Sequence, residues 1–446
     1  MAQVETLILG AGLAGLSAAY HLEGGFHIIE KSDRPGGLCK SELRETTAGT
    51  FTFDHTGHWL HLRDPEIRKL VDTLLPGAFV EIERKARIYS NGIFTRYPYQ
   101  VNTFGLPAEV VSELLLGFQE AHFGEAGRAL REREPATFAE FILRHLGEGF
   151  AKHFMFPYNE KLYTVHPREL SAAWCGRFVP KPTFKQVVDG ALGIANDQLG
   201  YNAHFIYPRR GGIETLPKGF LPPVRKMGPL DCEVEPRAID AKHKRATLVD
   251  GRSFEYQHLV SSIPPQALLA LLRAGGEVPE AVDAASKKLR AVWTTYVNVG
   301  AKGPTLDSHW VYFPEPKFPF YRVGSPSSTY PATAPLGHSS FYVEFSRQMA
   351  EYPHRQAEQE AVDGLIACGM LESRAQVLFA EAHTIPNSYV LYDKEYGEAR
   401  KTVVEFLQSV GIEPVGRYGN WEYSSMEDAI RAGRDAALRI RARRAA

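Results

Sequence analysis

The sequence predicts an α/β protein in which a parallel sheet is accompanied by a helical insertion and an antiparallel β-sheet. Three observations support this fold class. An apolar strand pattern near the N-terminus meets a helix at a glycine-rich turn, mostly helical patterns follow Pro107, and alternating strand patterns flank that helical stretch. The 446 residues exceed what one hydrophobic core usually supports, so we expect two or three substructures.

The first unit is a strand, a helix and a second strand. Residues 4–9 form an apolar run short enough for a buried strand, and residues 13–22 follow the glycines with a helical pattern. Residues 26–29 are a second apolar run that ends at Glu30. This spacing is about that of a right-handed crossover and predicts a Rossmann-like domain.

Turn and cap signals divide the rest of the chain. Asn91-Gly92 and Asp250-Gly251 each separate two strand patterns and predict β-hairpins. Residues 137–140 form a capping box that begins a helix, which Gly147 is expected to stop. The apolar run at residues 258–262 predicts that the chain returns to the first sheet.

The first domain is therefore discontinuous in the sequence. Residues 292–300 and 340–345 are expected to be strands of the antiparallel sheet, and a long amphipathic helix is expected after Tyr418. We expect the Rossmann-like domain at residues 1–77, 211–288 and 376–446, the helical domain at 105–198, and the antiparallel sheet domain at 78–104, 199–210 and 289–375.

Composition restricts the classes of function. Lys and Arg total 51 against 52 Asp and Glu, which leaves no overall field to attract nucleic acid or anionic lipid. The four cysteines are far apart and form no metal-ligand pair, so we expect a reducing compartment and no metal site. Neither a secretion signal nor a long apolar run is evident, which predicts a cytoplasmic protein without stable membrane insertion.

The glycine-rich turn predicts a dinucleotide site. Gly10, Gly12 and Gly15 form G-x-G-x-x-G, in which missing side chains permit a tight turn and the close approach of a pyrophosphate. Glu30 follows at the end of the second strand, where it can accept hydrogen bonds from a ribose hydroxyl. Because NAD and FAD both use this fingerprint, the turn alone does not choose between them.

The residues after Glu30 favour FAD. Residues 30–38 resemble the E-x-x-x-x-x-G-G motif of the amine-oxidase and mutase flavoproteins. The resemblance implies that Arg34, Gly36 and Gly37 lie along the FAD pyrophosphate or flavin. The alternative is that these residues only shape a loop.

From Phe53 onward the chain resembles the UDP-galactopyranose mutases, especially the eukaryotic branch, over nearly its whole length. Residues 53–58 are similar to the family's D-x-G-G-H loop, with Thr56 in place of the first glycine. The resemblance implies that Gly57 contacts the cofactor and that His58 faces the flavin near N5, where it positions and tunes the ring. Outside this motif, a structural histidine would be the more common interpretation.

Two further motifs resemble the family's nucleotide side. Residues 97–102 are similar to Y-P-F-Q-N-N, and residues 157–163 are similar to P-Y-N-x-K-x-W, with a tyrosine in place of the tryptophan. The resemblance implies substrate contacts by five residues of these motifs: Tyr97, Tyr99, Gln100, Asn159 and Tyr163. The tyrosine at the tryptophan position leaves the nucleotide open.

Two arginines resemble the pair that clamps the substrate diphosphate in this family. Residues 174–177 are similar to its W-x-G-x-R region and supply Arg177, and the F-Y-R segment at residues 320–322 supplies Arg322. A diphosphate needs planar, bidentate donors, which arginine provides better than lysine. Surface ion pairs are the alternative for either residue.

The remaining motifs resemble segments that close the flavin site. Residues 207–212 are similar to F-P-x-R-G-G and residues 416–423 to G-R-F-G-x-W-x-Y. The resemblance implies cofactor contacts by Gly211, Gly212, Gly416 and Glu427 and a substrate phosphate contact by Tyr423. In two places the chain departs from the mutases: residues 424–429 look more like protoporphyrinogen-oxidase and desaturase relatives, and Ile385 replaces a tyrosine, with Tyr389 and Tyr392 following later.

The resemblance implies a flavin-dependent mutase that interconverts the pyranose and furanose forms of a nucleotide-linked sugar, UDP-galactose or a relative. N5 of reduced FAD would attack the anomeric carbon, and an external reductant such as NAD(P)H or a reductase would keep the flavin reduced. One alternative is an FAD-dependent oxidase or dehydrogenase of the amine oxidase or protoporphyrinogen oxidase type. The other is a non-catalytic flavoprotein that serves as a binding module.

Overall fold

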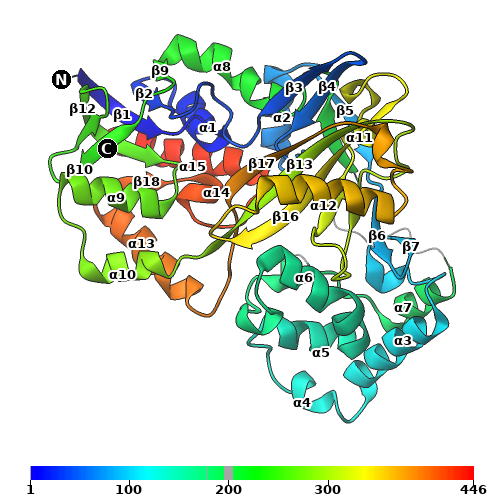
Figure 1. Ribbon diagram of the computed structural model, residues 1–446. Coiled ribbons are helices and arrows are strands. Elements are labelled where there is room, and N and C mark those ends of the chain that lie inside the picture. The colour runs from blue at the N-terminus through cyan, green and yellow to red at the C-terminus, as the bar shows by residue number, and fades with distance from the viewer. Residues whose placement is uncertain (1, 178, 195–203, 446) are drawn as a thin grey trace.

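The protein was examined as a computed structural model that describes residues 2–177, 179–194 and 204–445. Its fold is mixed α/β, as predicted, with one largely parallel sheet, one largely antiparallel sheet and a helical part that follows the first hairpin of the second sheet in the chain. Figure 1 shows the first sheet with its helices on one side of the molecule and the α3–α7 helices as a lobe on the other.

The first sheet is built around the predicted strand–helix–strand unit. Its strands run in the order β10-β11-β12-β1-β2-β9, with β18 also paired to β12. They are β1 (Ala2–Leu9), β2 (Phe26–Ile29), β9 (Leu230–Asp231), β10 (Pro236–Asp240), β11 (Arg245–Leu248), β12 (Ser253–Ser261) and β18 (Ile412–Pro414). Strands β1, β2 and β12 pair in parallel, and the hairpin predicted at Asp250-Gly251 joins β11 to β12.

Helices cover both faces of this sheet. The side chains of β1 alternate between two hydrophobic cores, one on each face. Ile8 packs with helices α1 (Leu13–Leu22), α8 (Thr215–Met227) and α15 (Met426–Ala445). Leu7 and Leu9 pack in the other core, with α9 (Pro265–Gly275), α10 (Glu280–Lys287) and α13 (Tyr396–Ser409). The first helix has the bounds that the apolar pattern predicts.

The second sheet has the order β17-β13-β16-β15-β14-β6-β7. Its strands are β6 (Ala86–Ser90), β7 (Ile93–Arg96), β13 (Ala291–Lys302), β14 (Trp310–Tyr312), β15 (Arg322–Gly324), β16 (His338–Gln348) and β17 (Val377–Val390). The hairpin predicted at Asn91-Gly92 joins β6 to β7. Helix α12 (His354–Ala367) packs against β13 and β17, and Ala357, Ala361 and Leu365 lie in the same hydrophobic cluster as side chains of this sheet.

One predicted domain boundary needs correction. Residues 376–390 were assigned to the Rossmann-like domain, but β17 pairs antiparallel with β13 along most of its length. No strand was predicted here from the sequence, and the pairing of this segment depends on residues about 90 positions away in the chain. The chain therefore re-enters the first sheet only at α13 and β18.

Two short antiparallel pairs lie beside the larger sheets. Strand β3 (Ser41–Thr46) pairs with β4 (Gly49–Asp54), and β5 (Phe79–Glu83) pairs with β8 (His204–Pro208). Helix α2 (Pro65–Leu74) begins after Asp64, whose side chain accepts hydrogen bonds from the amides of Glu66 and Ile67. These elements carry the loops that approach the site described below.

The helical lobe contains α3 (Ala108–Phe123), α4 (Arg128–Arg131), α5 (Phe138–Phe150), α6 (Phe156–Tyr163) and α7 (Phe184–Ala191). Thr137 and Glu140 form the predicted capping box at the start of α5. Gly147 does not end this helix but kinks it, with a φ of 80° that a side chain would strain. Within the described residues, no helix is both long and apolar enough to cross a membrane, and no cluster of side chains is suited to a metal ion.

Candidate functional site

A large cavity of about 700 Å³ lies between the first sheet, the second sheet and the start of α15. It extends from Gly10 and Glu30 at the ends of β1 and β2 to Arg322 and Glu344 on β15 and β16. Twelve of the predicted site residues line it: Gly10, Gly12, Glu30, Gly36, Gly37, Gly57, His58, Tyr97, Arg322, Gly416, Tyr423 and Glu427. Thr56, where the sequence departs from the family motif, lines it as well.

The glycines at one end leave room where two chain segments almost touch. Gly12 bridges to Gly36, and a Cβ added to Gly37 would lie 3.0 Å from the Cα of Gly12. A Cβ on Gly15 would lie 2.0 Å from the carbonyl oxygen of Gly10, so Gly15 serves the packing of the turn rather than the cavity wall. Helix α1 begins here without a side-chain cap, so the amides of its first turn are available to an anion.

Glu30 stands beside this turn as predicted for a ribose-binding carboxylate. Its Oε2 accepts a hydrogen bond from the Ala11 amide at 2.7 Å, and its Oε1 accepts one from the Ser32 amide at 2.8 Å. Two backbone donors fix the carboxylate, and each oxygen retains a further lone pair for a hydroxyl donor. The residue is buried and lines the cavity.

His58 lies in the wall of the same cavity, on the turn that follows β4. Burial lowers the pKa of its imidazole to about 4, and the positive charges of Arg417 and Arg322 act in the same direction. The ring is therefore neutral at physiological pH and can offer one donor and one acceptor. Gly57 is required next to it, because a Cβ there would meet the Trp59 ring at 2.2 Å.

Arg322 forms a buried ion pair at the far end of the cavity. Its Nη2 donates to Glu344 Oε1 at 2.7 Å, and its Nε donates to Glu344 Oε2. Arg322 and Glu344 are cross-strand neighbours on β15 and β16, and the Glu344 side chain is 1% exposed. Two nitrogens of the guanidinium are therefore directed at Glu344. The resemblance had implied that Arg322 clamps a substrate diphosphate, and in this structure only part of its guanidinium could do so.

Two tyrosines and a second arginine complete this end. The rings of Tyr389 and Tyr423 stack with their centroids 5.9 Å apart, and the Arg417 guanidinium lies 5.3 Å from the first and 4.7 Å from the second. Arg417 also donates to the carbonyl oxygens of Ser388 and Ser424, which holds it in place. All three side chains line the cavity beside Arg322.

Four predicted substrate contacts do not line the cavity. Tyr99 is fully buried, stacks on Phe154 and exchanges a hydrogen bond with Ser90 Oγ at 3.3 Å. Gln100 is buried beside Met155, and the Asn159 amide donates to the Met155 carbonyl. Tyr163 is buried with its ring 5.7 Å from that of Trp174. In this structure these four side chains belong to the core of the helical lobe, and their substrate contacts stay predictions.

Three predicted cofactor contacts also lie elsewhere. Arg34 forms ion pairs with Asp33, Glu42 and Glu214 rather than facing the cavity. Gly211 and Gly212 have φ angles of 75° and 63°, and a Cβ on Gly212 would lie 2.3 Å from Ser41 Oγ. These glycines allow the chain to turn against β3. The side chain of Arg177 lies outside the part of the structure that is described.

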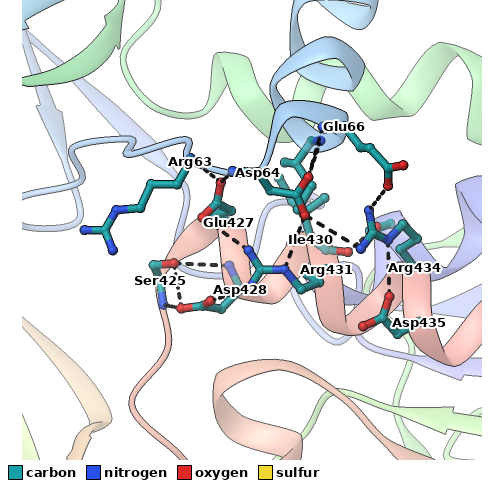
Figure 2. Close-up of polar contacts among 12 residues, drawn as sticks. Arg63, Asp64, Glu66, Ser425, Glu427, Asp428, Ile430, Arg431, Arg434 and Asp435 are labelled. Carbon is teal, nitrogen blue, oxygen red and sulfur yellow. Dashed lines mark hydrogen bonds and ion pairs between the residues drawn. The ribbon is translucent and has the colours of Figure 1, made fainter. Parts of the chain in front are cut away.

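Glu427 lines the cavity but has partners in the protein. Figure 2 shows its carboxylate between the loop at residues 63–64 and the start of α15. Its Oε1 accepts hydrogen bonds from the amides of Arg63 at 2.5 Å and Asp64 at 2.7 Å, and Arg431 Nη2 is 3.3 Å from Oε2. The carboxylate thus ties the segment after His58 to α15, and a contact with the cofactor stays a prediction.

Sequence reasoning did not single out Glu344, Tyr389 or Arg417 as site residues. Arg417 lies in the motif that supplied Gly416, and Tyr389 follows the missing tyrosine at position 385, so both could have been found. Glu344 gives no local signal. It lies within an ordinary strand pattern, and only its register opposite Arg322 reveals its role.

Comparison with known proteins identifies the family. A sequence model of the flavin-containing amine oxidoreductases matches residues 13–441. The chain belongs to this family. A crystal structure of a reduced UDP-galactopyranose mutase superposes with a TM-score of 0.89 and 25% identity over 99% of this chain and 94% of that one.

Two further solved structures share the fold of this chain. A candidate protoporphyrinogen oxidase from Exiguobacterium sp. has a TM-score of 0.71 at 15% identity, with 99% of each chain covered. Cyclohexylamine oxidase from Brevibacterium oxydans has a TM-score of 0.64 at 17% identity, with 99% of this chain and 100% of that one covered. These two show the fold alone.

The residues present fit FAD, the cofactor that the family implies. The glycine cradle and the uncapped start of α1 suit a pyrophosphate, and Glu30 beside them suits a ribose. The cavity continues past Gly416 to His58, which gives a three-ring system space next to the neutral imidazole. A flavin dinucleotide needs one continuous space of this kind, and the structure has it.

Proposed function

We propose that this family member is a flavin-dependent mutase that interconverts the pyranose and furanose forms of a nucleotide-linked sugar, UDP-galactose or a relative. The observation that carries the proposal is the end of the cavity opposite the glycine cradle. Arg322, Arg417, Tyr389 and Tyr423 meet there, and together they suit a diphosphate. The likeness to UDP-galactopyranose mutase, with its TM-score of 0.89, supports the same function.

Glu344 gives Arg322 a fixed direction. With Nε–H and one Nη2–H engaged, the two Nη1 donors and the second Nη2–H of Arg322 are left for a substrate phosphate. The Tyr389 and Tyr423 hydroxyls add donors, and burial raises the pKa of Tyr389 to about 12, so it stays protonated. These groups would hold the diphosphate while its bond to the sugar is broken and remade.

FAD, held by the glycine cradle and Glu30, would in its reduced form supply a nitrogen nucleophile able to take the place of the diphosphate at the anomeric carbon until the diphosphate bonds there again. His58, neutral at physiological pH, would hold the flavin edge by hydrogen bonding. The sugar enters and leaves at the same oxidation level, so an external reductant, such as NAD(P)H or a reductase, is needed only to reduce the flavin initially.

The same arrangement disfavours an amine oxidase. Amine substrates bind as cations or lose a proton, and Arg417 and Arg322 would repel the cationic form. Glu344 compensates one of the two positive charges and leaves the other. The proposal therefore favours an anionic substrate over the amines that the family name suggests.

The test is turnover of UDP-galactopyranose and related nucleotide sugars by dithionite-reduced and oxidised protein, with ring-isomer products separated by chromatography. Reduced protein should form the furanose isomer without consuming reductant in proportion. Arg87→Gln removes an arginine that forms an exposed ion pair with Asp307, away from the cavity, and serves as the control for loss of an arginine. Its turnover should equal that of wild type. Equal turnover by oxidised protein, or oxidation of one substrate molecule per cycle, would show an oxidase instead.

A further inference from the structure

Asp54, the last residue of β4, is a buried carboxylate that the proposed reaction does not use. It is 7% exposed and accepts three hydrogen bonds from three segments of the chain. Ser41 Oγ donates to Oδ1 at 2.6 Å, the Ile213 amide donates to Oδ1 at 2.9 Å, and Tyr207 Oη donates to Oδ2 at 2.7 Å. The carboxylate therefore joins β3, β8 and the start of α8 at one point.

The turn from Asp54 to His58 is held at its first residue, where the His55 amide donates to the Lys40 carbonyl oxygen at 3.1 Å and the His55 ring lies 3.3 Å from Glu42 Oε1. Thr56 has a φ of 68°, in the left-handed region that a threonine rarely adopts. Gly57 lies against the Trp59 ring and the Tyr342 hydroxyl. Asp54 and His58 border the same small hollow of about 10 Å³ behind the cavity wall. A strained turn keeps its shape only when its surroundings fix it. Asp54 is the end of this turn that three hydrogen bonds hold in place.

We propose that Asp54 is the positioning residue for His58, and that its ionised carboxylate holds the turn at residues 55–58 in the wall of the flavin cavity. An ionised carboxylate accepts from all three donors, whereas a protonated one presents a hydroxyl to one of them. Protonation of Asp54 therefore breaks one of its three hydrogen bonds. The turn at residues 55–58 then becomes looser, and the surroundings of the flavin change. This inference rests on the family's flavin and not on the mutase reaction.

Asp54 and His55 are the two groups of this turn that can titrate near pH 6, since burial raises the pKa of the carboxyl and lowers the pKa of the imidazole. Burial raises the pKa of Asp54 to about 6, although its three donors oppose this shift. The titratable groups that face it are Cys39, Tyr207, Glu214 and Tyr296, with His55 on its own turn. Burial raises the pKa of the thiol and of both tyrosines, so these three stay neutral near pH 6.

The experiment follows the absorbance spectrum of oxidised, FAD-loaded protein without substrate from about pH 5 to about pH 8. Wild type should show a spectral transition centred near pH 6, and Asp54→Asn should lack it while retaining FAD. Tyr207→Phe removes a donor to the ionised form, so its transition should move upward by roughly one pH unit or more. His55→Gln tests the other titratable side chain of the turn and should keep the wild-type transition.

Each outcome of the pH titration either supports the role of Asp54 or overturns it. A transition that persists in Asp54→Asn, disappears in His55→Gln, or is absent in wild type overturns the proposal. If Asp54→Asn fails to retain FAD, wild type and Tyr207→Phe decide, because an unmoved midpoint in Tyr207→Phe excludes Asp54 as the source. A negative result in the nucleotide-sugar assay leaves these spectra unaffected, so the two proposals fail independently.

Discussion

Replacement of Arg322 by alanine should damage the protein in two separable ways. The first is structural, since the change leaves the Glu344 carboxylate, 1% exposed, without its cation. Removing one partner of a buried pair typically costs about 3–5 kcal/mol. The second is functional, since a charge-assisted contact to the substrate contributes about 1.5–3 kcal/mol, which lowers kcat/KM by roughly one to two decades.

The double variant Arg322→Met with Glu344→Gln separates these effects. It removes both charges and fills most of the volume, so much of the lost stability should return. The contact to the substrate phosphate does not return, so kcat/KM should stay roughly one to two decades below wild type. Arg322→Lys should rescue turnover only partly, because an ammonium cannot bind Glu344 and a phosphate through one rigid fork.

The assay pairs urea unfolding of FAD-loaded protein with turnover of UDP-galactopyranose by the reduced form. The double variant should lie close to wild type in unfolding free energy and close to Arg322→Ala in turnover. If turnover recovers together with stability, Arg322 serves the fold alone and the assignment of a substrate contact is refuted. FAD content, measured for each variant, should stay at the wild-type level because Arg322 lies away from the glycine cradle.

Three further predictions follow from other parts of the structure. The FAD should be non-covalent, so acid should release it intact for mass analysis, and a flavin retained by the denatured chain would contradict this. Gly212→Ala should destabilise the protein by about 1–3 kcal/mol in thermal or urea unfolding, because its φ is 63° and its Cβ would meet Ser41 Oγ, whereas Gly92→Ala, with free space around it, should cost less. Burial lowers the pKa of His309 to about 4, below its ordinary 6.5, so its stabilising contribution is present above pH 6.5 and is lost as pH falls toward 4. His309→Asn, which keeps an acceptor for the Lys85 amide, should reduce this acid dependence by on the order of 3 kcal/mol, and an unchanged slope would exclude His309 as its source.

The sequence predicted the parts of the fold whose signals are local. The glycine turn, the first helix and the hairpins at Asn91-Gly92 and Asp250-Gly251 depend on a few adjacent residues, and the structure confirms each. The partner of β17 could not be predicted in this way. A strand pattern records which residues are apolar, and the choice between two sheets is made by contacts remote in the chain.

The site shows the same limit at the level of side chains. A motif gives the position of a residue in the chain but not the direction of its side chain. Tyr97 and Tyr99 lie two residues apart in one motif, yet the first lines the cavity and the second stacks on Phe154 in the helical lobe. Arg34 likewise had three carboxylates within reach, and its ion pairs with them could be found only from the folded chain.

The departures from the mutase motifs have different consequences once they are placed in the structure. Tyr163 lies outside the cavity wall, with its ring 6.5 Å from that of Tyr389, so its replacement of a tryptophan acts through packing. Ile385 lines the cavity, and there a hydroxyl is lost. A bulge in β17 between the pairs Thr294–Ile385 and Val292–Tyr389 brings Tyr389 into the same wall. Because a bulge re-aims side chains without changing the strand's partner, we expect Tyr389 to supply the hydroxyl that Ile385 lacks.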